Sequence, residues 1–119
     1  MSSMNENNQD WKLKLRYGKL TTPFTHYIDF ATGFIGEMLS QDSGYPVGPA
    51  IMGIKIWAKD MQDSVDLLYG IADQIGFTIT GDIDVAEMPP EQPPETEPYG
   101  YDCTFTPFQS DDSTENSSL

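Results

Sequence analysis

Several features that often stabilise or activate a small protein are scarce in this chain, which has one cysteine, one histidine and six basic residues among 119. Because Cys103 stands alone, the chain can form neither an internal disulfide nor a cysteine-based zinc site. No apolar run approaches the roughly 20 residues that a membrane-spanning helix needs. The N-terminal stretch has no basic region followed by an apolar one, so no secretory signal is predicted. These absences predict a cytoplasmic protein that does not bind a membrane.

Basic residues are missing altogether after Lys59, whereas fourteen acidic residues follow it, and the net charge of the chain is −13. A field of this sign repels phosphate groups, which argues against direct binding of nucleic acid or of an anionic membrane. It favours a basic protein surface as the partner. The alternative interpretation is that the acidic residues only keep the protein soluble.

Composition predicts one domain between two tails. Residues 1–10 and 109–119 contain too little apolar surface to offset the entropy of ordering their backbone, so both are predicted to be disordered. Residues 11–108 can build a single hydrophobic core. Within that domain, residues 88–98 contain five prolines and three acidic residues, which predicts an extended segment lying on the surface.

Alternation of apolar and polar residues predicts most of the strands. Trp11–Tyr17 alternates apolar with basic residues, and Phe24–Phe30 alternates with His26 on the same side as Phe24. These two segments are expected to pair as an antiparallel hairpin. The same kind of pattern predicts a strand at 77–85 and a short C-terminal strand ending at Pro107. A strand at 50–58 is predicted from its isoleucines, a brief extension of the sheet is predicted at 34–39, and glycines and prolines predict a loop at 40–49.

Between residues 61 and 75 the apolar period changes to steps of three and four, which predicts an amphipathic helix. Asp60 is placed to cap its start and Gly76 to end it. The strand–helix–strand order makes the strands at 50–58 and 77–85 run in parallel. The predicted fold class is therefore α+β: a mixed, mostly antiparallel sheet of four to five strands with one amphipathic helix on one face.

A strand order follows from charge. If the strand at 77–85 lay beside the strand at 11–17, Asp82 and Asp84 would face a row of basic side chains, and such cross-strand pairs are stabilising. The predicted order across the sheet is 77–85, 11–17, 24–30 and 50–58.

No catalytic residue, metal ligand or cofactor site is assigned. Nucleophilic catalysis needs a nucleophile with a positioned base, but His26 lies among apolar positions, and Cys103 alternates in step with Tyr101 and Phe105, so both are interpreted as structural. Asp82 and Asp84 offer oxygen ligands to a divalent cation, but no loop has the spacing of a calcium site. An enzyme that uses Cys103 with His26, or a metal bound by carboxylates, is the alternative.

The half of the chain without basic residues predicts the functional surface. Its candidate partner-binding residues are Asp63, Asp66, Asp73, Asp82, Asp84, Glu87, Tyr99 and Tyr101. The expected function is that of a small non-enzymatic module that docks on a basic protein surface, such as an inhibitor or immunity-type protein of bacterial or phage origin that imitates a nucleic acid. A structural subunit that forms a homodimer through the open face of its sheet is a further alternative.

Overall fold

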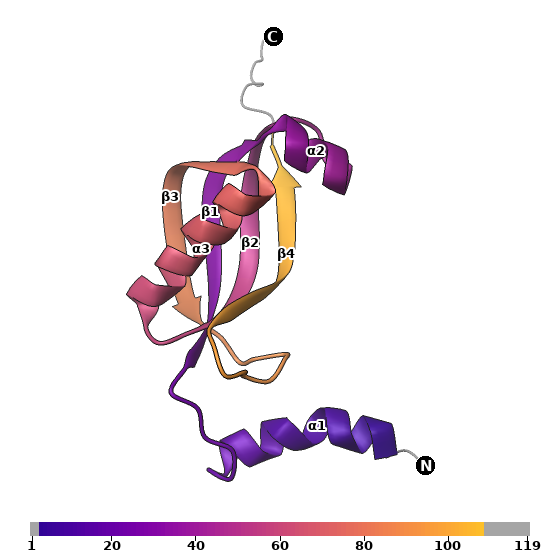
Figure 1. Ribbon diagram of the computed structural model, residues 1–119, viewed down its shortest axis with the longest axis vertical. Coiled ribbons are helices and arrows are strands. Elements are labelled where there is room, and N and C mark those ends of the chain that lie inside the picture. The colour runs from indigo at the N-terminus through magenta and orange to yellow at the C-terminus, as the bar shows by residue number, and fades with distance from the viewer. Residues whose placement is uncertain (1–2, 109–119) are drawn as a thin grey trace.

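One antiparallel sheet, crossed on one face by a helix, organises residues 3–108, which the computed structural model describes (Figure 1). The elements in chain order are α1 (Ser3–Arg16), β1 (Thr25–Ile35), α2 (Glu37–Ser43), β2 (Gly48–Ala58), α3 (Met61–Ile75), β3 (Phe77–Glu87) and β4 (Tyr99–Pro107). The strand order is β3-β1-β2-β4, and each neighbouring pair is antiparallel. The fold is therefore α+β, as the sequence predicts. The predicted tail at 109–119 lies outside the described residues.

Helix α3 begins and ends at the predicted residues. The Asp60 carboxylate accepts a hydrogen bond from the backbone N–H of Asp63 at 2.8 Å, which satisfies one of the free donors of the first turn. Gly76 adopts a left-handed conformation, φ 93°, that a residue with a side chain rarely adopts. In the apolar stripe of α3, Leu68 and Ala72 are buried against the sheet, whereas Met61 at the start of the helix is half exposed.

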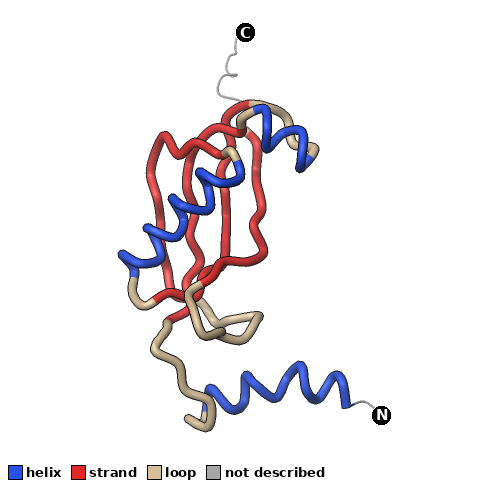
Figure 2. The backbone as a smooth tube through the Cα atoms, viewed as in Figure 1, coloured by secondary structure: helices blue, strands red, loops and turns tan. Residues whose placement is uncertain are grey.

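The core lies between α3 and one face of the sheet, whereas no helix among residues 3–108 covers the opposite face, here called the open face (Figure 2). On the core side, Met52, Ile54 and Ile56 of β2 are buried with Ala31 and Ile35 of β1. Gly33 is required where β1 passes beneath Phe77, because a Cβ there would overlap the Phe77 ring and the carbonyl of Thr78. The single layer of helix leaves one side of every strand outside the core.

The segment Trp11–Arg16 is helical and Tyr17 belongs to the turn that follows, so the prediction of a strand at Trp11–Tyr17 is wrong. None of its residues is β-branched, and leucine, lysine and arginine are strong helix formers. Gly18, at φ 76°, ends the helix: the N–H of Lys19 donates to the carbonyl of Lys14 at 2.8 Å, and the N–H of Gly18 donates to that of Leu15 at 3.3 Å. Helix α1 begins at Ser3, so most of the predicted N-terminal tail has helical backbone here.

Without a strand at 11–17, the predicted hairpin is absent and β3 pairs directly with β1. The predicted order 77–85, 24–30, 50–58 is otherwise correct, and β4 adds to the far edge beside β2. Strands β2 and β3 do run in the same direction, as the crossover requires, but β1 lies between them, so the sheet contains no parallel pair. The predicted extension of the sheet at 34–39 is correct only for Phe34 and Ile35, because helix α2 begins at Glu37. The predicted loop at 40–49 is helical at its start for the same reason.

Strand β4 contains an irregularity that breaks the predicted alternation of Tyr101, Cys103 and Phe105. Its register against β2 shifts between the pairs Gly53–Thr104 and Lys55–Tyr101, and Asp102 has a positive φ of 56°. An extra residue in one strand changes the face to which the following side chains point. Phe105 packs against the core, whereas Cys103 is exposed.

Candidate functional site

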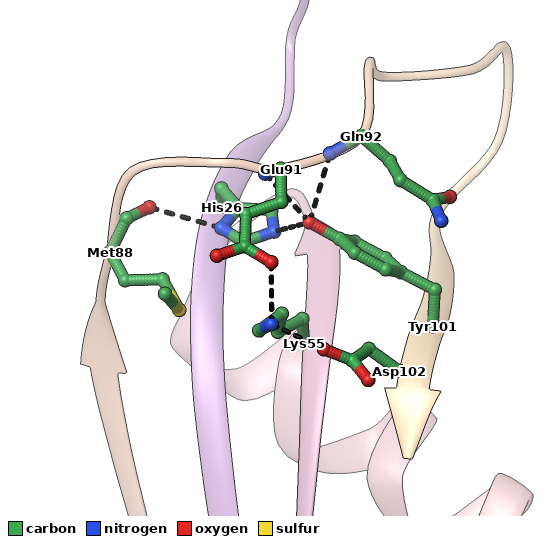
Figure 3. Close-up of polar contacts among 7 residues, drawn as sticks. All are labelled: His26, Lys55, Met88, Glu91, Gln92, Tyr101 and Asp102. Carbon is green, nitrogen blue, oxygen red and sulfur yellow. Dashed lines mark hydrogen bonds and ion pairs between the residues drawn. The ribbon is translucent and has the colours of Figure 1, made fainter.

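The densest group of polar contacts joins the loop at 88–98 to the ends of β1, β2 and β4 (Figure 3). The Tyr101 hydroxyl lies at its centre and accepts hydrogen bonds from the backbone N–H groups of Glu91 at 2.9 Å and Gln92 at 3.1 Å. Its own proton is directed to Nε2 of His26, 2.8 Å away. One hydroxyl thus fixes two residues of the proline-rich loop and the only histidine.

These contacts define the tautomer of His26. Nδ1 lies 3.0 Å from the Met88 carbonyl oxygen, which can only accept, so Nδ1 carries the proton and Nε2 accepts from Tyr101. The ring is 4% exposed and packs edge-on against Trp57, with centroids 5.0 Å apart. Burial lowers the pKa of His26, an effect that the hydrogen bond to the Met88 carbonyl partly offsets. The fold therefore stabilises the neutral form of the His26 ring.

Lys55 lies beside this group and forms ion pairs with Glu91 of the loop, at 2.7 Å, and with Asp102 of β4. The hydrogen bonds to Asp102 and then Glu91 raise the pKa of Lys55, which keeps the amine charged. Asp102 has a positive φ, and its carboxylate points toward Lys55. Lys55 thus joins the loop and the bulge of β4 from the open face of β2.

Two more side chains hold the same loop. The indole N–H of Trp57 donates to the Gln92 carbonyl at 2.8 Å, and the Tyr99 hydroxyl donates to the Pro93 carbonyl at 2.6 Å. Burial, followed by the charge of Glu95, raises the pKa of Tyr99 to about 12. The predicted partner-binding residues Tyr99 and Tyr101 thus use their hydroxyl groups within the fold, where they fix the loop.

The geometry of His26 and Cys103 does not assemble a nucleophile with its base. Both ring nitrogens of His26 are occupied by Met88 and Tyr101. Although Cys103 is exposed as a residue, partial desolvation of its thiol, and then the nearby charge of Asp102, raises the pKa of that thiol to about 11. A raised pKa lowers the fraction of thiolate, the reactive form, at neutral pH.

A second candidate site is a shallow depression on the open face, with a volume of about 360 Å³. Phe30 and Ile51 contribute its apolar surface and are 45% and 38% exposed. Asp82 and Asp84 of β3 line one side, and neither forms an ion pair with another described residue. An apolar patch bordered by free carboxylates suits a ligand that has both apolar and basic groups. We call this depression the open-face groove.

No family model, no curated protein and no solved structure matches this chain. The function must therefore be argued from the groove, the charges and the loop contacts alone.

The structure separates the predicted acidic residues into two surfaces. Asp82 and Asp84 lie at the open-face groove. Asp63, Asp66 and Asp73 belong to α3, on the other side of the sheet, and the Asp63 carboxylate accepts a hydrogen bond from the backbone N–H of Lys59 at 3.0 Å. Glu87 is exposed at the end of β3, opposite Tyr27. The two sets cannot contact the same flat partner surface together.

The sequence did not indicate which side of β1 becomes buried. Phe24, His26, Ile28 and Phe30 share one side of the alternation, but the core takes the other side, which includes Tyr27 and Ala31. Asp29 is consequently fully buried, and both its oxygens accept from the Ser64 hydroxyl, at 2.9 and 2.7 Å. Burial raises the pKa of Asp29 to about 6, although the bond from Ser64 opposes this shift.

Within the described part of the chain, no group of three or more histidine, cysteine, aspartate and glutamate side chains is placed to hold a metal ion. No helix in that part has both the length and the apolar character needed to cross a membrane.

Proposed function

We propose that this protein is a non-enzymatic binding module whose open-face groove receives a basic, amphipathic segment of a partner protein. The observation that carries the proposal is the placement of exposed Phe30 and Ile51 directly beside Asp82 and Asp84. Apolar side chains of the partner would cover the exposed residues, and its lysine or arginine side chains would pair with the carboxylates. Burial of the apolar groups supplies affinity, and the charges supply orientation and a fast encounter.

Two further observations support a binding role. The net charge of −13, with no basic residue after Lys59, attracts basic proteins at long range. The Tyr101 hydroxyl and both ring nitrogens of His26 are already occupied by hydrogen bonds within the fold. In its concrete form, the proposal is an inhibitor or immunity-type protein whose carboxylates occupy a basic surface of a nucleic-acid-handling protein.

A homodimer that pairs two open faces is a weaker candidate. It would bury the same exposed residues, but it would also bring two very acidic surfaces together. Like charges across an interface oppose association. The groove therefore favours a basic partner over a second open face.

The test uses a synthetic peptide that alternates leucine and lysine as a probe of the groove, with a leucine–glutamate peptide of the same length as its control. We expect the basic peptide to bind, measured by calorimetry, and the acidic peptide not to bind. Phe30→Ser and the pair Asp82→Asn with Asp84→Asn should each weaken binding at least tenfold. The triple change Asp63→Asn, Asp66→Asn and Asp73→Asn is the matched control on α3. Equal losses from both acidic sets, or no binding at all, would refute the groove as the site.

A further inference from the structure

Helix α1 cannot bury its apolar residues on one side. Successive residues of an α-helix are rotated by about 100°, so Trp11 and Leu15 lie on one side and Leu13 and Tyr17 on nearly the opposite side. Leu13 is 48% exposed and Tyr17 69% exposed. The helix makes no substantial contact with another described helix or strand. As a helix, this segment always leaves one apolar pair in water.

As a strand, the same segment would place all four apolar side chains on one side and Lys12, Lys14 and Arg16 on the other. Little stability opposes the change, because a helix of 14 residues that packs on no other described helix or strand is marginal in water. The segment Trp11–Tyr17 is therefore suited to pair with an exposed strand edge that offers an apolar side and an acidic side.

The outer edge of β3 offers both sides. It is an end strand of the sheet, and its pairing with β1 is regular from Ile83 to Glu87. On the side facing α3, Ile83 and Val85 are only partly buried at the margin of the core. On the open face, Asp82 and Asp84 are exposed. The unpaired N–H and C=O groups of such an edge are a template for another strand.

The edge of β4 is a poorer template. Its register is interrupted at Asp102, where φ is positive, and it ends at Pro107, which has no N–H to donate. Bulges and prolines are common devices that prevent pairing at an edge. The two edges of the sheet are thus not equivalent.

We propose that Trp11–Tyr17 of one copy adds as a fifth strand to the outer edge of β3 in a second copy, and that reciprocal exchange forms a homodimer. The apolar side of the segment then extends the core beside Ile83 and Val85, while its basic side faces Asp82 and Asp84. A shift of one residue would turn the basic side of the segment toward the core and its apolar side toward Asp82 and Asp84. The side-chain pattern therefore sets the register. Reciprocal exchange closes the assembly at two copies.

A second copy is a better source of the segment than the same chain. Within one chain, residues 18–24 must carry the segment across the end of β3, because β1 lies on the inner side of β3. The shortest such connection leaves the segment parallel to β3. A second copy can supply an antiparallel strand, the slightly more stable pairing, without that constraint. The inference does not rest on the proposed function. Both use Asp82 and Asp84, but strand addition also needs the free edge of β3, whereas the groove also needs its apolar floor.

The decisive experiment mixes two charge-reversed full-length chains. The first carries Lys12→Glu, Lys14→Glu and Arg16→Glu, and the second carries Asp82→Lys and Asp84→Lys. Alone, each chain faces like charges at both strand contacts, and its dimer dissociation constant should rise about tenfold or more above that of the wild type. In the mixture, the segment of each chain meets charges of opposite sign on β3 of the other chain. Sedimentation should therefore show a restored heterodimer. The pair Lys19→Glu with Lys59→Glu is the control, because it changes the net charge in the same direction as in the first chain but outside both strand contacts.

The pairing itself is tested by Leu13→Pro, which removes a backbone donor from the segment. Because α1 makes no substantial contact with the sheet, this variant should keep the circular dichroism of the sheet and the peptide binding of the groove, while it loses the dimer. Phe30→Ser should keep the dimer and lose the peptide binding of the groove. The inference is overturned by a wild-type chain that stays monomeric at its highest soluble concentration, by a mixture without heterodimer, or by a Leu13→Pro chain that dimerises normally.

Discussion

The carboxylate of Asp29 on β1 and the hydroxyl of Ser64 on α3 are both fully buried and hydrogen-bonded to each other. Ser64 approaches both oxygens, at 2.9 and 2.7 Å, and thereby joins the first turns of α3 to the centre of the sheet. A buried carboxylate without such a donor would bear the full cost of leaving water.

Loss of this donor should cost more stability at neutral pH than at low pH. Ser64→Ala removes a hydrogen bond to a charged group, worth about 1.5–3 kcal/mol, and it raises the pKa of Asp29 further. Because folding already raises that pKa from 3.8 to about 6, the folded state binds the proton more tightly. The contribution of Asp29 to stability is therefore fully present below 3.8 and lost as pH rises through about 6. Urea unfolding between pH 3.5 and 7, with Asp29→Asn as the control that lacks this slope, measures the effect.

The Tyr101 hydroxyl should stabilise the loop, and its partner His26 should make the stability of the fold depend on pH. Tyr101→Phe leaves His26 Nε2 without a donor and two loop amides without their acceptor, so we expect a loss of about 1–3 kcal/mol. Because folding lowers the pKa of His26, the stability that its neutral ring contributes is present above its ordinary value of 6.5 and is lost as pH falls through the lowered value. Chemical unfolding of His26→Asn should lack this acid-side loss. Tyr99→Phe, which removes one exposed bond to Pro93, is the milder control.

The packing of α3 is tested by one buried and one exposed residue in adjacent positions. Leu68 is completely buried, so Leu68→Ala should lower the free energy of unfolding by about 2–5 kcal/mol. Tyr69 is half exposed, and Tyr69→Ala should change it by less than about 1 kcal/mol. Similar losses from both substitutions would contradict the orientation of the helix.

Deletion of residues 1–10 together with 109–119 should leave the melting temperature nearly unchanged. Residues 3–10 belong to α1, which makes no substantial contact with another described helix or strand, and residues 109–119 are predicted from composition to be disordered. A loss above about 1 kcal/mol would show that one of the segments stabilises the fold.

Salt should separate a steering role of the carboxylates from a purely solubilising one. If Asp82 and Asp84 guide a basic partner, the association rate should fall steeply as the Debye length shrinks from about 30 Å at 0.01 M to about 10 Å at 0.1 M. Replacing both by asparagine should reduce this salt slope without changing the circular dichroism. An unchanged slope in this variant and in the α3 set would assign the charge to solubility only.

The sequence determined helix α3 and most of the sheet by itself. The apolar period of residues 61–75, with Asp60 and Gly76 at its ends, is a local signal that tertiary contacts had no reason to override. The sequence also carried a signal for the end of α1, because Gly18 follows a segment that has no β-branched residue. Alternation alone misled there, because helix-forming residues can alternate as regularly as strand-forming ones.

Only the tertiary structure decided which side of each strand is covered. Both sides of β1 carry apolar residues, so alternation showed which residues share a side but not that α3 would cover the one with Tyr27 and Asp29. That choice buried Asp29 and left Phe30 on the open face beside Asp82. The bulge of β4 likewise brought Tyr101 to His26, across 75 positions of the chain. Such contacts depend on register and on where a helix docks, and these are properties of the assembled sheet, not of any one segment.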